Sequence, residues 1–96
     1  MKITGNTLIL HGELNYEILA EMEQNLKSLV EQKDYSEFVV DMQKVDYVTS
    51  PCIGSLLIAH LGCDKNDKKL KILMNRKCLL FFSLANLDKI LNIAVI

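Results

Sequence analysis

Several residue types that mark specialised architectures are scarce in this sequence. It has one proline, no tryptophan and four scattered glycines, so it contains neither a flexible linker nor a Gly-rich loop that could hold a phosphate. No apolar run approaches the roughly 18 residues of a membrane span. The first six residues lack the apolar stretch of a signal peptide. We therefore expect a single domain over residues 1–96, with no direct membrane insertion.

The cysteines and histidines lack the spacing of disulfide or metal sites. Cys52, Cys63 and Cys78 are odd in number and form no Cys-x-x-Cys pair, so reduced thiols in a cytoplasmic protein are the simplest interpretation. His11 and His60 lie far apart, with no further ligands at metal-binding spacing. We therefore expect no metal and no other cofactor.

Charge is nearly balanced, which argues against a nucleic-acid partner. Eleven basic and twelve acidic residues give a formal net charge of −1, whereas phosphate binding needs a cationic surplus or patch. The modest lysine cluster over residues 65–71 is typical of a solvated turn.

No catalytic group is indicated either. His60 falls on an apolar helix face with no nucleophile or acid placed beside it, so a packed, hydrogen-bonded histidine is the favoured interpretation. Cys52 is expected at a helix N-terminus, where a thiol can become reactive, but a small residue filling space is favoured there. We therefore expect that the chain is not an enzyme.

The hydrophobic pattern predicts alternating strands and helices. We expect helices at 16–33, 51–63 and 76–85, the first capped by Asn15 and the last ended by Asn86 in a left-handed conformation. Strands are expected at 2–4, 7–12, 38–41, 70–74 and 93–96, and the turn at residues 5–6 predicts that the first two form a hairpin. The order β-β-α-β-α-β-α-β predicts an α/β fold with a mixed sheet and helices packed against it, in which strands joined by helical crossovers are parallel.

The second predicted helix has two contrasting faces. We expect Ser50 to cap it and Pro51 to occupy its first position. Larger side chains would face the sheet: Ile53, Leu56, Leu57, His60 and Leu61. Small residues and one branched side chain would face away: Gly54, Ser55, Ile58 and Gly62. Glycine inside a helix costs about 1 kcal/mol relative to alanine, which either the close approach of a partner or packing within the domain would explain.

The third predicted helix offers a competing contact surface. Two sets of its residues follow helical spacing: Cys78, Phe81, Phe82 and Ala85, and nearly so Leu80, Leu84 and Leu87. If the first set forms the core, Leu79 and Leu80 are exposed. Adjacent exposed leucines indicate either a contact surface or a crowded small domain.

Residues 45–57 (VDYVTSPCIGSLL) resemble the signature of the STAS family, in which a strand leads through an Asp-Ser-Ser-Gly-Leu-Gly type turn into a helix. Three further segments resemble STAS segments in the same order: GELN at 12–15, FVVDM at 38–42 and LANLDKI at 84–90. The resemblance also selects Cys78, Phe81, Phe82 and Ala85 as the core face of the third helix. The resemblance implies a regulatory module like the bacterial anti-sigma factor antagonists. These act in transcription regulation by partner switching, docking on an anti-sigma factor or a related histidine-kinase-like partner.

The turn departs from the family pattern where phosphorylation occurs. Aligned on residues 53–54, the family's Asp falls on Thr49, its first Ser on Ser50, its phosphorylatable Ser on Pro51 and its Gly on Cys52. Proline cannot accept a phosphate, which would add about −1.5 to −2 charge to the docking surface. We therefore expect the usual switch to be missing. Ser50 or Thr49 could replace it, or they could serve only as a helix cap and a loop hydroxyl.

We expect the partner to contact the turn and the outward helix face, at Ser50, Gly54, Ser55, Ile58 and Gly62. The resemblance also admits a STAS subunit of a lipid or anion transport complex that docks on an ATPase, and a degenerate scaffold that no longer switches. Whether the chain forms a homodimer stays open.

Overall fold

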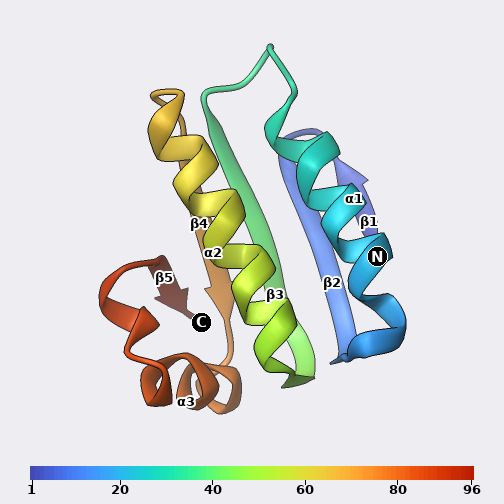
Figure 1. The fold of residues 1–96 in the computed structure, drawn as a ribbon, viewed down its shortest axis with the longest axis vertical. Helices are drawn as coiled ribbons and strands as arrows, with labels where there is room; N and C mark the ends of the chain where they lie inside the picture. The colour runs from blue at the N-terminus through green and yellow to red at the C-terminus, as the bar shows by residue number, and fades with distance from the viewer.

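The computed structural model describes all 96 residues and confirms the predicted order of elements (Figure 1). The strands are β1 (Lys2–Thr4), β2 (Thr7–Leu14), β3 (Glu37–Val48), β4 (Lys69–Met74) and β5 (Asn92–Val95). The helices are α1 (Leu19–Val30), α2 (Ser50–Lys65) and α3 (Arg76–Leu84), with 3-10 turns η1 (Tyr16–Ile18) and η2 (Leu87–Lys89).

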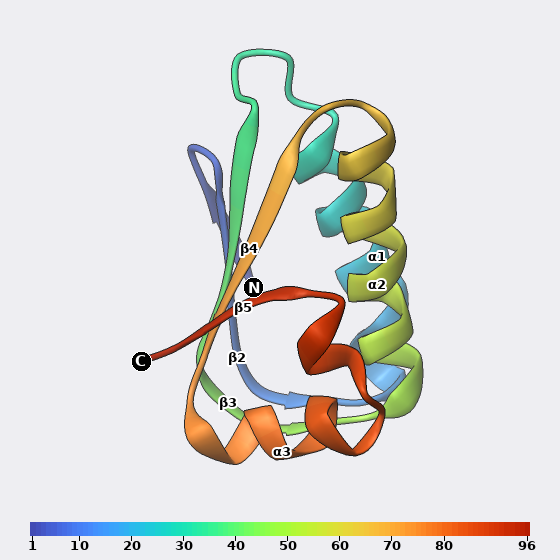
Figure 2. The ribbon, with the colours of Figure 1, turned by 90° about the vertical axis from the view of Figure 1, so that its left-hand side faces the viewer.

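The five strands form one mixed sheet in the order β1-β2-β3-β4-β5. β1 pairs with β2 in an antiparallel hairpin, and the remaining neighbours are parallel, as the helical crossovers predict. α1 and α2 lie side by side on one face of the sheet, and α3 lies across one end of it (Figure 2). Because parallel strands end at the same edge, the end of β3 and the start of α2 lie near α3.

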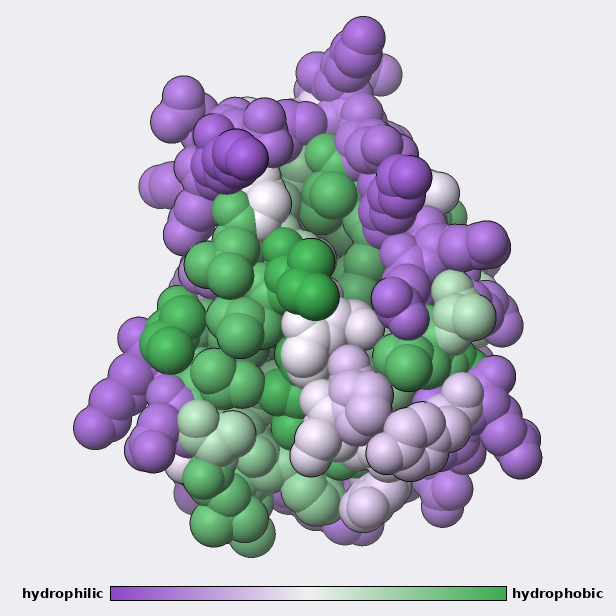
Figure 3. All heavy atoms as spheres, in the orientation of Figure 1, coloured by the Kyte–Doolittle hydropathy of each residue, from purple (hydrophilic) through white to green (hydrophobic).

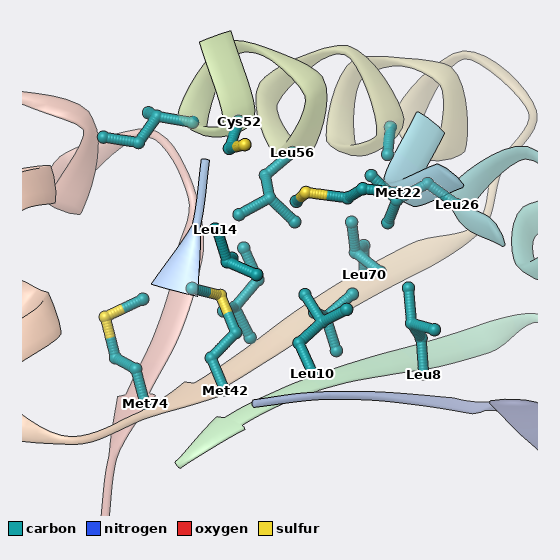
Figure 4. Packing of buried hydrophobic residues seen from close by; sticks show 14 of the residues in the cluster. Leu8, Leu10, Leu14, Met22, Leu26, Met42, Cys52, Leu56, Leu70 and Met74 are labelled. Carbon is teal, nitrogen blue, oxygen red and sulfur yellow. The ribbon is translucent and has the colours of Figure 1, made fainter. Parts of the chain in front are cut away.

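The core is a single apolar layer between the sheet and the helices, and it contains no buried polar or charged residue. Figure 4 shows side chains from the strands pointing toward side chains from α1 and α2. The labelled residues are Leu8, Leu10, Leu14, Met42, Leu70 and Met74 from the strands, and Met22, Leu26, Cys52 and Leu56 from the helices. This layer packs one side of α2 against the sheet and leaves its other side facing away from the core.

β3 is longer than the sequence predicts. The predicted strand ends at Asp41, whereas β3 continues to Val48 because β2 also extends and pairs with it through Leu14↔Val48. Val45 and Val48 are buried, while the polar residues between them are exposed. In this half of β3 every third residue is buried, because register shifts in the pairing with β2 interrupt the usual alternation. One face of this sheet carries no helix (Figure 2), so the polar side chains between the buried ones can face solvent.

The ends of the helices follow their capping residues. Asn15 caps the start of the first helical segment as predicted, with its Oδ1 accepting from Glu17 N at 3.0 Å. That segment begins as a 3-10 turn, and α1 ends at Val30, three residues before the predicted end. Asn86 adopts the predicted left-handed conformation, with φ +58°.

α2 is rotated relative to the predicted register. Its buried stripe is Cys52, Ile53, Leu56, Ala59 and Cys63, whereas Leu57 and His60 are only half-buried and Leu61 is 52% exposed. Leu57 packs partly against the core and the His60 side chain is only 13% exposed, so only the expectation that Leu61 faces the sheet was wrong. The helix is apolar on all sides, so periodicity does not select its core face, and packing places several small side chains against the sheet.

α3 also differs in part from its predicted register. Cys78 and Phe82 are buried as expected, but Ala85 is exposed and Leu79 packs partly against the core. Leu80 and Leu84 are 63% and 78% exposed. The competing apolar surface on α3 is therefore formed by Leu80 and Leu84, and the expectation that Leu79 is exposed was wrong.

Candidate functional site

The turn between β3 and α2 is tied to the end of β2 by Thr49. Thr49 N and Thr49 Oγ1 both donate to the carbonyl oxygen of Leu14, at 2.9 and 3.0 Å. The Thr49 hydroxyl also lies 3.4 Å from Cys52 Sγ, which in turn is 3.7 Å from the carbonyl oxygen of Asn15. Cys52 is fully buried. These contacts fix the direction in which α2 leaves the sheet.

Ser50 occupies a different position from the one expected. The N-cap is Thr49, whose side chain makes no capping hydrogen bond, and Ser50 is the first helical residue. The expectation that Ser50 caps α2 was therefore wrong. Ser50 is exposed, and its hydroxyl takes part in none of the hydrogen bonds of the turn. Pro51 lies in the first turn, where a missing N–H removes no helical hydrogen bond.

A hollow of about 520 Å³ lies beside this turn. Its walls come from four separate parts of the chain: Tyr16, residues 47–51, Ile53, and Phe81, Leu84 and Ala85 of α3. The Tyr47 and Phe81 rings meet edge to face, with their centroids 5.4 Å apart. Sequence reasoning missed the contributions of Tyr16, Tyr47 and Phe81, because only the fold brings η1, β3 and α3 together at this end of the sheet.

The outer face of α2 is apolar and open. Ile58 is 71% exposed, and Leu61 continues this face one turn further along the helix. Figure 3 shows a hydrophobic area over α2 that extends toward α3 and is bordered by hydrophilic side chains. A Cβ atom added at Gly54 or Gly62 would meet no other atom within 4 Å. Packing within the domain therefore does not require either glycine.

A groove of about 380 Å³ separates part of α2 from α1. Ser55, Ile58 and Gly62 line it from α2, whereas Gly54 is not among its lining residues. Ser55 is half-buried, and its Oγ donates to the Pro51 carbonyl oxygen at 3.2 Å. The expectation that Ser55 simply points into solvent was therefore wrong. The free side of α2 thus has two surfaces. One is an outer ridge, defined as Gly54, Ile58 and Leu61, of which Leu61 was not predicted to face outward. The other is the groove, which shares Ile58 with the ridge and is also lined by Ser55 and Gly62.

The remaining titratable side chains in the helices form no cluster with the site. Burial raises the pKa of the Cys63 and Cys78 thiols. His60 Nε2 lies 3.4 Å from Asp64 Oδ2, while His60 Nδ1 is buried without a hydrogen-bond partner. The prediction that His60 is hydrogen-bonded was therefore wrong: its Nε2 is only at ion-pair distance from Asp64, and its Nδ1 has no partner. No group of three or more His, Cys, Asp or Glu side chains could hold a metal ion.

None of the helices combines the length and the apolar character needed to span a bilayer. No curated protein matches the sequence. A family model described as "Mlab, STAS domain" matches residues 2–93, which includes the β3–α2 turn and every helix. Domains of this family are regulatory or protein-interaction modules. With a match over nearly its whole length and the α/β architecture expected from its motifs, the chain belongs to the STAS domain family.

Proposed function

We propose that this chain is a non-enzymatic regulatory module that docks on a protein partner through the first turn and the outer face of α2. The partner is an anti-sigma factor or a related histidine-kinase-like regulator. The observation that carries this proposal is the outer ridge, which exposes Ile58 and Leu61 beside a glycine that internal packing does not need.

The exposed apolar side chains are costly without a partner. A helix that is hydrophobic all round is normally buried on all sides, and contiguous apolar patches on a monomer commonly mark interaction sites. Gly54 and Gly62 each destabilise α2 by about 1 kcal/mol relative to alanine. Of the two explanations open for these glycines, the free space around their Cβ positions favours the close approach of a partner backbone.

The turn supports docking without the usual phosphorylation switch. Pro51 occupies the position of the family's phosphorylatable serine and cannot accept phosphate. Of the two neighbouring hydroxyls, that of Thr49 is held by the Leu14 carbonyl oxygen, whereas that of Ser50 is exposed. If a kinase modifies this turn, Ser50 is therefore the better acceptor. We propose that binding is not controlled by phosphate at the usual position.

A second candidate is a subunit of a lipid or anion transport complex that docks on an ATPase. The observation that favours it is the combination of an apolar ridge with a missing acceptor at Pro51. Permanent interfaces are more hydrophobic than reversible ones, and a permanently bound subunit has no need of a phosphorylation switch.

Affinity purification of the intact chain tests the proposal and separates the two candidates. A kinase-fold partner supports the first candidate and a transporter ATPase the second. The Leu61→Asp variant should lose the partner, whereas Leu80→Asp on α3 should keep it. Both substitutions place a carboxylate at a site where the native leucine is more than half exposed, so unchanged circular dichroism is expected for both. Loss of the partner from Leu80→Asp alone would assign docking to α3 and refute the proposal.

A further inference from the structure

The groove between α1 and α2 has the dimensions of two helical turns. Its α1 wall runs from Glu23 to Glu31, and its α2 wall runs from Ser55 to Gly62. At 1.5 Å per residue, these walls are about 12 and 10 Å long. The groove therefore matches a short elongated segment rather than a single side chain.

The floor of the groove is apolar. Leu26 and Ala59 are buried at its base, Val30 is half-buried and Ile58 is largely exposed on its α2 side. At Gly62 the α2 wall has no side chain, and the space there is open. A row of aliphatic side chains spaced one helical turn apart would fit this floor.

Of the residues that line the groove, the three that are charged all come from the rim on the α1 side. Glu23, Lys27 and Glu31 follow one another at four-residue spacing, and all three are exposed. The chain's single ion pair joins His60 to Asp64, so none of these three side chains is paired. Two carboxylates and one ammonium group give this rim a net negative charge. The two carboxylates are eight positions apart, which is about 12 Å along the helix. In Figure 3, hydrophilic side chains on the α1 side border the hydrophobic area.

From this geometry we infer that the groove binds an amphipathic helix of the docking partner. One face of that helix carries aliphatic residues at i, i+4 and i+7, and its flank carries two basic residues about eight positions apart, opposite Glu23 and Glu31. This inference rests on the proposed docking function and names the chemistry of the segment that α2 receives.

A second copy of this chain does not meet the requirement. The α1 helix of a second copy would bring Glu21, Glu23 and Glu31 toward the same acidic rim, and like charges placed opposite one another oppose such pairing. The α3 helix of a second copy exposes Leu80 and Leu84, but its basic residues, Arg76 and Lys77, are adjacent at one end and not eight positions apart. A basic segment from a different protein is complementary to the rim.

Two labelled 16-residue peptides test the inference with the intact chain. Both carry leucine at i, i+4 and i+7, and they differ only in having two arginines or two glutamates, eight positions apart, beside the leucine face. Fluorescence anisotropy should show that the arginine peptide binds more tightly by about tenfold, as expected for two exposed charge pairs changed from attraction to repulsion. The double variant Glu23→Lys/Glu31→Lys should reverse this preference.

Chemical shifts of the amide groups locate the bound peptide. The arginine peptide should shift Val30, Ile58 and Gly62 and should leave the bare face of the sheet unchanged. Equal affinity for the two peptides, no binding of either, or shifts confined to α3 would each overturn the inference.

The purified partner keeps this inference separate from the proposed function. If Leu61→Asp loses the partner while Glu23→Lys/Glu31→Lys binds it normally, docking through α2 stands and the basic helix in the groove is refuted. If Leu61→Asp also binds normally, the docking proposal itself is refuted. Leu61 is suited to this comparison because it lies on the outer ridge and not in the lining of the groove.

Discussion

Replacing Gly62 with alanine should stabilise the isolated chain and weaken its complex. Alanine favours an α-helix over glycine by about 1 kcal/mol, and the new methyl group would meet no atom within 4 Å. For a chain of this size, a gain of about 1 kcal/mol raises the melting temperature by roughly 4–8 °C. In the complex, the same methyl group occupies space that the partner needs, so the effect on affinity has the opposite sign.

Urea and thermal unfolding measure the first effect, and titration calorimetry with the purified partner measures the second. Gly12→Ala is the matched control. An added Cβ atom at Gly12 also meets nothing within 4 Å, but unlike Gly62 this residue has a left-handed backbone, with φ +73°. A left-handed conformation costs an L-residue about 1–2 kcal/mol, so Gly12→Ala should destabilise the chain. If Gly62→Ala destabilises the isolated chain, or if it binds the partner with unchanged affinity, the argument that this glycine serves docking is refuted.

Three further predictions concern the turn, the thiols and the start of α3. After incubation with a cognate anti-sigma kinase and ATP, peptide mapping should find no phosphate on Pro51 and any phosphate on Ser50. Phosphate on Thr49 would contradict the hydrogen bond that holds the Thr49 hydroxyl to the Leu14 carbonyl oxygen. Burial raises the pKa of the Cys63 and Cys78 thiols from the ordinary value of 9.0, so the folded state retains these protons as the unfolded state loses them. The contribution of these thiols to the free energy of unfolding should therefore be fully present below pH 9 and be lost as the pH rises above it. In urea unfolding at a series of pH values, Cys63→Ala/Cys78→Ala should reduce this loss. An unchanged dependence of the free energy on pH would contradict the raised pKa values. Asn75 caps α3, because its Oδ1 accepts from Cys78 N at 2.8 Å, and its Nδ2 donates to two carbonyl groups of β3. Asn75→Ala should therefore lower the free energy of unfolding by about 2–3 kcal/mol. A loss below about 0.5 kcal/mol would show that these hydrogen bonds contribute little.

Local sequence signals were sufficient where one segment determines its own conformation. Asn15 and Asn86 were identified as the residues that begin and end helices, because capping and left-handed turns depend on one side chain and its immediate backbone. The hairpin of β1 and β2 was likewise predicted from the turn at residues 5–6, where Gly5 has φ +59°. The order of strands and helices followed from such signals taken together.

The same signals were insufficient where a segment contacts several others. β3 was predicted to end at Asp41, which closes a short apolar run, yet pairing with β2 extends the strand to Val48. The hollow beside the turn joins Tyr16, Tyr47 and Phe81, which lie in three separate elements. Contacts of this kind depend on long-range placement, which hydrophobic periodicity does not describe.

The sequence by itself determined the α/β class, the parallel crossovers and the absence of a hydroxyl group at position 51, because each depends on residue type and order along the chain. Only the tertiary structure decided which side of α2 is free. The helix is apolar all round, so either register would bury hydrophobic surface, and close packing selected the stripe with Cys52, Ala59 and Cys63 for the core. That choice turned Leu61 outward and opened the groove beside α1.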